Sequence, residues 1–353
     1  MTKIKTTTKN SIRINGTLIS PNQRIIIDLP VADLYTHTPL SLPVQVINGN
    51  KGGPRLFVSA AIHGDELNGV EIIRRLLTLS SLRHLQGTLI AIPIVNIYGL
   101  LHHSRYLPDR RDLNRSFPGS GQGSLAARLA HLFMTKIVAH CTHGIDLHTG
   151  ALHRANLPQI RAKLDDPETE QLARAFGVPV ILNSEIRDGS LREAAAERGI
   201  PMLLYEAGEA LRFDELSIRA GVRGIIAVMR TLGMLPPSRR KKPITEPFVA
   251  RSSTWVRAPH SGIFRNITPL GNHVRKGERL GIVSDPFGQE EIEIRSSSNG
   301  IVIGRTSLPL VSEGEALFHI ARFQDIKEVA EQVEAFQEEQ QNELVRESEP
   351  PII

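Results

Sequence analysis

The chain has 353 residues, of which 41% are hydrophobic and 22% charged, with a net charge of +5 and a single cysteine, Cys141. This composition predicts an ordinary globular protein, long enough for two domains, and it excludes an intramolecular disulfide. No apolar run approaches the roughly 20 residues of a membrane helix, and the start of the chain has no apolar signal core. We therefore expect a cytoplasmic protein without a membrane partner.

The basic residues are spread along the chain, and their one run, residues 239–242, lies in a proline-flanked stretch that is typical of a solvated linker. Aromatic residues make up 5% of the chain, which is too few to suggest base stacking. These features argue against nucleic acid as a partner. The sequence does not decide the number of subunits and is compatible with a homo-oligomer.

From Arg55 onward the sequence alternates short apolar runs with amphipathic stretches, which predicts an α/β domain over residues 1–240. A β-rich lead-in over residues 10–50 contains expected strands at 23–29 and 43–47. Further strands are expected at 56–62, 88–95, 144–147, 178–182 and 202–205. Helices are expected at 67–79, 125–140 and 191–198, the last with a capping box formed by Ser190 and Glu193.

After a linker at 241–250, residues 251–321 show short apolar pairs and many glycines, which predicts a small all-β module. The module contains a repeat: residues 257–264 match 295–302, and residues 274–280 match 311–317. It resembles a barrel-sandwich hybrid of the biotinyl/lipoyl type. No lysine lies between Lys276 and Lys327, so a cofactor-carrying arm is not expected and a structural or entrance-shaping role is. Residues 322–353 form an acidic tail, expected as a frayed helix and a disordered end.

The segment around residues 56–73 carries the most chemical information. An apolar strand ends directly on His63, and Glu66 follows three residues later where a helix is expected to begin. Groups at a strand's carboxyl end and in the next turn converge above the sheet edge, where open α/β folds place their sites. Imidazole and carboxylate are both zinc ligands, so His63 and Glu66 are candidates for two ligands of a metal site. A lone His-x-x-Glu arises often by chance, so a third ligand must decide.

Asp146 and His148 lie in Asp-Leu-His-Thr-Gly, where a short strand again ends on a histidine before a small turn. His148 is the expected third ligand. A set of two histidines and one glutamate leaves a fourth position for water, as catalytic zinc sites require. Asp146 either supports His148 from behind or lines the pocket, because residues two apart on a strand share a face.

Two further segments supply polar groups for a reaction. Asn114 and Arg115 are adjacent in a loop anchored by apolar neighbours, and such a pair can clamp a carboxylate, although a surface turn is the alternative. Arg105, Arg110 and Arg111 are candidates to polarise a carbonyl group. Glu206 ends an apolar strand, where a carboxylate suits a general base, although a solvent-facing strand end would look the same.

Together these motifs resemble the succinylglutamate desuccinylase/aspartoacylase family, which is related to zinc carboxypeptidases. His-Gly-Asp-Glu at 63–66, Asp-Leu-Asn-Arg at 112–115, Asp-Leu-His at 146–148 and Glu-Ala-Gly at 206–208 occur in the family's order. The resemblance covers residues 55–210, and the β module also looks like that of bacterial members. It implies a zinc carboxypeptidase-like mixed sheet flanked by helices.

The resemblance also implies roles for single residues. One Zn²⁺ per chain would be bound by His63, Glu66 and His148. Asn114 and Arg115 would grip a substrate carboxylate, and Glu206 would be the general base. Arg105 matches the family's carbonyl-polarising arginine only if about two extra residues are allowed before Asp112, so Arg110 and Arg111 stay open.

The expected reaction is hydrolysis of an amide bond in a carboxylate-bearing substrate. A small N-acyl amino acid, cleaved by a deacylase, is the first expectation. The alternative is a metallocarboxypeptidase that trims C-terminal residues, including acidic ones, from a peptide or protein. A metal-free binding protein is disfavoured, because no ligand or base is missing.

Overall fold

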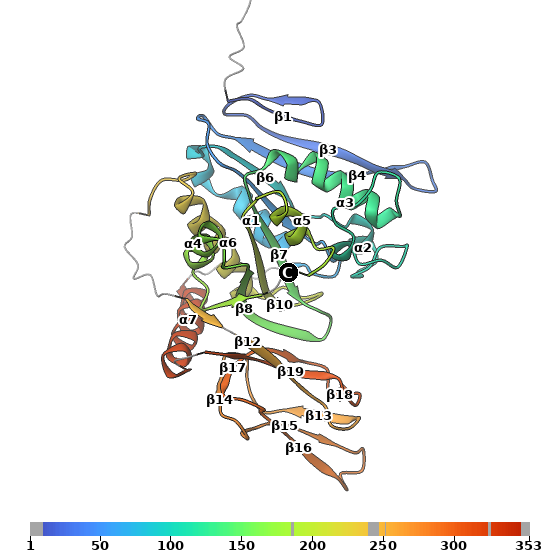
Figure 1. Ribbon diagram of the computed structural model, residues 1–353, viewed down its shortest axis with the longest axis vertical. Coiled ribbons are helices and arrows are strands. Elements are labelled where there is room, and N and C mark those ends of the chain that lie inside the picture. Colours follow the sequence, from blue (N-terminus) through green and yellow to red (C-terminus); the bar gives the residue numbers. More distant parts are fainter. Residues whose placement is uncertain (1–9, 185–186, 239–246, 251, 324–325, 347–353) are drawn as a thin grey trace, which may run out of the picture.

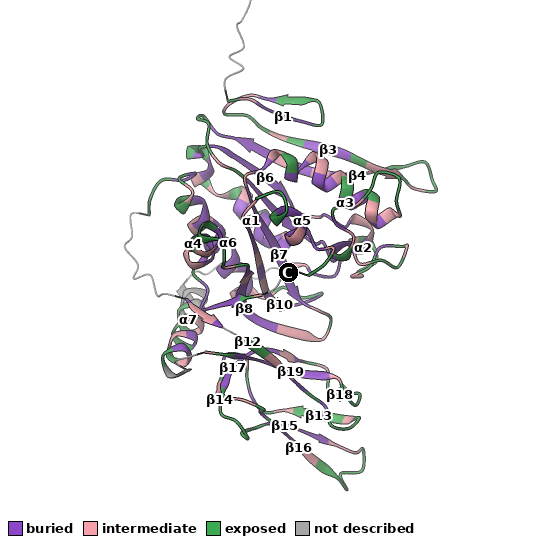
Figure 2. Ribbon diagram, viewed as in Figure 1, coloured by how far each residue is buried: buried purple, intermediate pink, exposed green. Residues whose placement is uncertain are grey.

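The computed structural model describes residues 10–184, 187–238, 247–250, 252–323 and 326–346. Its centre is a 13-stranded mixed sheet in which four neighbouring strands run parallel. In spatial order these are β10 (Met202–Glu209), β7 (His143–Gly150), β5 (Arg55–Ala60) and β6 (Thr88–Ile92). All eight residues of β7 are buried, which is typical of a parallel strand covered on both faces. Figure 2 shows this buried centre in purple.

The N-terminal strands complete one side of the sheet. β4 (Pro39–Asn48) pairs antiparallel with β6, and β3 (Arg24–Asp33) forms the outer edge beyond it. A small separate hairpin is made by β1 (Ile12–Ile14) and β2 (Thr17–Ile19). The strands predicted at 23–29 and 43–47 are therefore confirmed, and both are longer than predicted.

Helices cover both faces of the sheet, so the protein has three layers (Figure 1). One face is covered by α1 (Asn68–Thr78), α4 (Pro167–Phe176) and α6 (Glu215–Thr231). The other is covered by α2 (Ile97–Leu101), α3 (Leu125–Lys136) and α5 (Leu191–Ala196). Short 3₁₀ turns are η1 (Ser80–His84), η2 (Leu113–Arg115) and η3 (Val138–His140).

The elements of the α/β part that were not predicted include the short helix α2, the longer helices α4 and α6, and strand β8 (Arg154–Ala162). The helix starts carry ordinary signals. Asp166 caps α4 just before Pro167, and Asp214 caps α6 by accepting a hydrogen bond from the Ser217 amide. β8 is harder to recognise, because it mixes buried polar and apolar residues.

β8 joins the two parts of the chain. One edge pairs antiparallel with β10, and the other pairs with β17 (Gly300–Thr306). The sheet then continues through β19 (Ala316–Arg322) to β12 (Ser252–Arg257), which lie in the lower part of Figure 1. Strands from residues 252–322 therefore extend the same sheet that carries β10 and β7.

The predicted repeat is visible in how the last strands pair. The remaining strands are β13 (Gly262–Asn266), β14 (His273–Val274), β15 (Arg279–Ser284), β16 (Glu291–Arg295) and β18 (Leu310–Val311). Val274 lies opposite Gly300, and Val311 lies opposite Gly262. Because these positions are equivalent in the repeat, each copy lends its short strand to the first strand of the other.

Residues 241–246 of the predicted linker lie outside the described residues. Its end is ordered, since β11 (Phe248–Ala250) pairs in parallel with β9 (Val180–Asn183). In the predicted tail, α7 (Ile326–Arg346) buries Val329 and Val333 against residues of β17, and residues 347–353 are not described. Among the described helices, none is long and apolar enough to cross a membrane.

Candidate active site

His63, Glu66 and His148 come together at the carboxyl ends of β5 and β7. One nitrogen or oxygen of each side chain lies within 4.8 Å of the others, and all three residues are buried. His63 Nδ1 lies 2.7 Å from Glu66 Oε1, and His148 Nδ1 lies 2.8 Å from Glu66 Oε2. The two imidazoles therefore present the same type of nitrogen to one carboxylate, which forms a candidate metal centre.

The outer nitrogen of each imidazole contacts a second carboxylate. His148 Nε2 lies 2.6 Å from Asp146 Oδ2, and His63 Nε2 lies 3.2 Å from Asp112 Oδ1. Asp146 is in turn held by the Ser59 hydroxyl, which donates to its Oδ1 at 2.7 Å. Such outer carboxylates orient metal-binding imidazoles and raise their basicity. Of the two roles considered for Asp146, support of His148 is the one that its contacts match.

The turn between His63 and Glu66 has a shape that few sequences allow. Ala61 adopts a left-handed backbone with φ of 51°, which redirects the chain where β5 ends. A side chain at Gly64 would place its Cβ 1.9 Å from the backbone of Gly99 in α2, so only glycine fits this contact. Glu66 Oε2 also accepts a hydrogen bond from the Thr149 amide at 3.1 Å. The backbone thus fixes the ligand geometry.

The charges of the centre reinforce one another. Burial acts to lower the pKa of His63 and His148, but Glu66 and the outer carboxylates outweigh it, so both pKa values are raised. The two imidazoles hold the pKa of the Glu66 carboxyl well below its usual range, although burial acts to raise it. Glu66 is therefore ionised, and the centre favours a cation. A metal ion would displace the imidazole protons, because it binds the neutral ring.

Arg105 lies beside this centre. Its Nε and Nη2 donate to Asp112 Oδ2 at 3.1 and 2.9 Å, and its Nη1 lies 3.5 Å from Glu66 Oε1. Arg110 and Arg111 are exposed instead, and Arg111 contacts Asp109. Of the three arginines considered, Arg105 is the one whose guanidinium reaches the centre.

Asn114 and Arg115 lie in η2, which is capped by Asp112. Asn114 is buried, and its Oδ1 accepts a hydrogen bond from the Leu191 amide at 3.0 Å, which ties η2 to the start of α5. Arg115 is exposed. Burial of part of its guanidinium and the nearby charges of Arg187 and Arg105 lower the pKa of Arg115, which Asp112 partly offsets. Arg115 Nη1 donates to the Asn114 carbonyl oxygen at 2.5 Å, which leaves the other guanidinium nitrogens to face a ligand. Among the described residues, the hydrogen bond of the Asn114 side chain is the one that its Oδ1 accepts.

Glu206 lies on β10 directly opposite His148 on β7 and opposite Gln159 on β8. Its carboxylate forms an ion pair with Arg161 of β8, and the two side chains are 17% and 21% exposed. The sheet therefore brings the predicted general base to the strand next to the third ligand.

A sequence profile of the succinylglutamate desuccinylase/aspartoacylase catalytic domain matches residues 52–232. This match spans just over half of the chain and contains all four motifs that surround the centre. The chain belongs to this family. Family membership agrees with the mixed sheet, the flanking helices and the His-Glu-His cluster.

Individual family members resemble the chain beyond the catalytic part. The N-alpha-acetyl-L-2,4-diaminobutyric acid deacetylase of Halomonas elongata is 27% identical over 312 residues, which are 85% of this chain and 91% of the relative. The product-bound ectoine utilization protein of Ruegeria pomeroyi has a TM-score of 0.78 at 25% identity and covers 89% of this chain and 99% of its own. A succinylglutamate desuccinylase/aspartoacylase from Rhodobacter sphaeroides has a TM-score of 0.75 at 25% identity. The match covers 85% of this chain and 95% of the relative. The likeness therefore includes strands of the C-terminal β module.

Several residues around the candidate site were not found from the sequence. Ser59, Thr149, Gln159 and Arg161 all contact or flank the predicted residues. The alternation in Gln159-Ile-Arg161-Ala could have indicated a strand with one polar face. By contrast, Ser59 and Thr149 carry no local signal, because their role arises from the pairing of β5 with β7.

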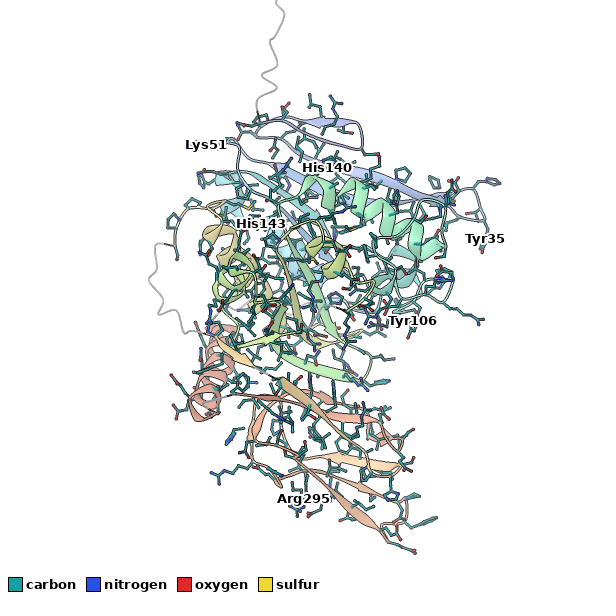
Figure 3. The ribbon with its side chains drawn as sticks, viewed as in Figure 1. Tyr35, Lys51, Tyr106, His140, His143 and Arg295 are labelled. Carbon is teal, nitrogen blue, oxygen red and sulfur yellow. The ribbon has the colours of Figure 1, made fainter. Side chains whose placement is uncertain are left out.

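Two other histidines, His140 and His143, lie apart from the centre. His143 begins β7, at the opposite end from His148, and its Nε2 lies 2.9 Å from Glu168 Oε1. His140 ends η3 just before that strand, and both are labelled in Figure 3. Their position agrees with a structural or surface role.

Proposed function

We propose that the protein is a zinc-dependent hydrolase that removes the acyl group from a small N-acyl amino acid bearing a free carboxylate. The observation that carries this proposal is the buried His63–Glu66–His148 cluster, in which each imidazole is oriented by its own carboxylate. Two imidazoles and one carboxylate form the ligand set of catalytic zinc sites with an open fourth position. These donors fit zinc better than magnesium or calcium, which prefer oxygen ligands.

Zinc at such a centre would supply Lewis acidity, which activates water near neutral pH and polarises a carbonyl group. Glu206, on the strand beside His148, would accept the proton of the attacking water and later pass it to the leaving amine. Arg105 would stabilise the negative charge that develops on the amide oxygen, because its Nη1 already reaches the centre.

Asn114 and Arg115 would hold the substrate carboxylate. Asn114 is rigid, because its carbonyl oxygen is bound to the Leu191 amide. Arg115 offers a planar, permanently charged partner that suits a carboxylate. A fixed carboxylate places the amide bond of a small substrate at a defined distance from the centre, which favours one orientation for attack.

The choice of a small N-acyl amino acid over a peptide is supported by the relatives. The Halomonas elongata protein is named as a deacetylase of an acetylated amino acid, and it aligns with 85% of this chain. The carboxypeptidase alternative uses the same clamp, and a substrate panel separates the two. The identity of the acyl group and of the amino acid is left to that panel.

The test is release of free amine from N-acetyl and N-succinyl amino acids, compared with peptides that have free C-termini. We expect turnover of at least one N-acyl amino acid, loss of that turnover after thorough chelation, and recovery with Zn²⁺. Turnover that survives complete metal removal would overturn the zinc proposal. Cleavage of peptides alone would replace the deacylase by the carboxypeptidase.

The role of Glu206 is tested by Glu206→Gln. We expect full zinc content and a decrease in kcat of about 10²- to 10⁴-fold, the usual range for a general base. Glu209→Gln is the matched control, because Glu209 lies on the same strand but contacts Ser307 of the β module instead. Wild-type rates in Glu206→Gln would refute the assignment.

A further inference from the structure

The residues on either side of Glu206 in the sheet do not hold its carboxylate. His148, its neighbour on β7, contacts Glu66 and Asp146 through its two ring nitrogens. Gln159, its neighbour on β8, is fully buried, and neither polar atom of its amide has a hydrogen-bond partner among the described residues. The side chain of the proposed base is therefore fixed from elsewhere.

Arg161 makes the contact that the two neighbours lack. It lies two residues beyond Gln159 on β8 and opposite Leu204, which is two residues before Glu206 on β10. Residues two apart on a strand share a face, so Arg161 and Glu206 project from the same side of the sheet. The ion pair joins Arg161 Nε to Glu206 Oε2, and it acts by charge, because neither atom makes a hydrogen bond among the described residues. Within the part of the chain that the structure describes, this is the one ion pair of Glu206.

Other basic residues compete for the same carboxylate. Arg192, at the start of α5, is buried, and its Nη1 donates to Ser184 Oγ at 2.7 Å. Burial and the charges of Arg161 and Arg187 lower the pKa of Arg192 to about 10, and Glu206 acts in the opposite direction. The Glu206 carboxylate thus interacts with two positive charges, that of Arg161 on β8 and that of Arg192 on α5.

Residues of the C-terminal β module close this basic group from the other side. His319 of β19 is buried, stacks on Trp255 with ring centroids 4.4 Å apart, and leaves its Nδ1 without a partner among the described residues. Burial, Arg161 and Arg187 hold the pKa of His319 at about 3, so the ring is neutral. The neutral ring therefore adds no positive charge that would compete with Arg161 for the Glu206 carboxylate.

We propose that Arg161 is a positioning residue that holds Glu206 in the orientation needed to receive a proton. This inference rests on the proposed role of Glu206, because Arg161 acts through that carboxylate and not on the substrate. A distance error of about 1 Å in a reacting group can lower turnover a hundredfold, so one ion pair is sufficient to matter.

The test is a double-mutant cycle with steady-state kinetics and zinc analysis. In Arg161→Gln we expect kcat to fall about ten- to hundredfold while KM changes less than about twofold, because base positioning affects the reaction and not substrate affinity. In the double variant with Glu206→Gln, loss of Arg161 should add almost nothing, since residues that act as a unit are not additive. Arg161→Lys should recover part of kcat.

The matched control is Arg187→Gln, which removes one positive charge from the same basic group. Arg187 is exposed, and its charge acts on Arg115, Arg192 and His319, so an effect on substrate binding would appear in KM and not in kcat. We expect its kcat to stay within about twofold of the wild type. A fall as large as that of Arg161→Gln would mean that overall charge, and not the ion pair, matters, and would overturn the proposal.

Three other results would also overturn it: an unchanged kcat in Arg161→Gln, a raised KM with an unchanged kcat, or fully additive losses in the double variant. If Arg161→Gln does not fold, Arg161→Lys still decides, because it must show lowered kcat at unchanged KM. An active Glu206→Gln single variant would instead refute the proposed function. An inactive Glu206→Gln beside a fully active Arg161→Gln would refute this inference alone.

Discussion

The metal-ligand half of the site and the Glu206 half lie on neighbouring strands, but they are built differently. Around His63 and His148, each inner ring nitrogen contacts Glu66 and each outer one contacts Asp112 or Asp146. Around Glu206, by contrast, the ion pair with Arg161 is the one charged contact of the carboxylate among the described residues. Within the same part of the chain, buried polar atoms of Gln159 and His319, and the two atoms of the ion pair itself, make no hydrogen bond.

This difference separates two tasks. A metal ligand must stay in place, and a saturated network of buried hydrogen bonds stabilises one geometry. A general base must exchange protons with water and an amine, so it cannot have all its oxygens occupied. We therefore expect substitutions in the first half to alter metal binding and those in the second half to alter turnover or stability.

The largest effect is expected from Glu66→Gln. This change keeps the shape of the side chain but removes the charge that contacts both imidazoles. Zinc content should fall from about one per chain to near zero, and kcat/KM should fall at least about a thousandfold, because the reaction depends on the metal. Metal analysis and amine release measure both. Full zinc content with normal turnover would contradict the division between the two halves.

Asp146→Asn should produce the next largest effect. An amide cannot accept the imidazole proton of His148 as a carboxylate does, so metal affinity should fall about 10- to 100-fold. Competition with a chelator measures this. Ser59→Ala, which removes only the hydroxyl behind Asp146, is the graded control and should weaken zinc less. An affinity equal to that of the wild type would show that the outer carboxylate is dispensable.

Gln159→Met should raise the stability of the protein, whereas the two preceding substitutions weaken zinc binding. The amide of Gln159 is fully buried and makes no hydrogen bond to any described residue, and an apolar side chain of similar length avoids the cost of burying it unpaired. We expect the free energy of unfolding to rise by about 1 kcal/mol in urea titrations. Zinc content should not change. A loss of stability would mean that the Gln159 amide has an important partner, and the contrast between the two halves would weaken.

The smallest effect is expected outside the site, at Glu71 of α1. Hydrogen bonds from Arg74, with help from Arg75, hold the pKa of Glu71 below its usual 4.5, although burial opposes them. A lowered pKa means that the carboxylate stabilises the fold above about pH 4.5 and that this contribution is lost as the pH falls through the folded-state pKa.

Glu71→Gln should therefore lower stability by about 1 kcal/mol or less at pH 7, because Arg74 is mostly exposed and solvent screens its charge. The deficit should shrink in urea titrations at progressively lower pH below 4.5. Zinc binding should be unaffected at pH 7. A loss of zinc in this variant would show that metal binding depends on carboxylates far from the centre, and not specifically on the side chains that contact His63 and His148.

Much of the α/β part could be predicted from periodicity. The strands that became β5, β6, β7 and β10, and the helices α1, α3 and α5, follow from runs with a clear period. β8 was not predicted, because polar residues recur along it and interrupt the apolar pattern, and the short alternation in Gln159-Ile-Arg161-Ala is its main local sign of a strand. Arg161 was missed because its partner, Glu206, lies on another strand, and no local sequence pattern indicates that contact.

The sequence by itself determined the local units of the site. His63 and Glu66 are three residues apart across one turn, and Asp146 and His148 are two apart on one strand, so covalent geometry alone brings each pair together. Only the tertiary structure decided how these units meet. The parallel pairing of β5, β7 and β10 places Glu66 against His148 and Glu206 beside it.

The tertiary structure also decided that the C-terminal β module extends the catalytic sheet. That junction depends on the pairing of β8 with β17, which are separated by more than a hundred residues. Backbone hydrogen bonds between distant strands carry no sequence signature of their own, since every non-proline residue offers the same donor and acceptor. Which strand becomes the neighbour of which is settled by the packing of the whole chain.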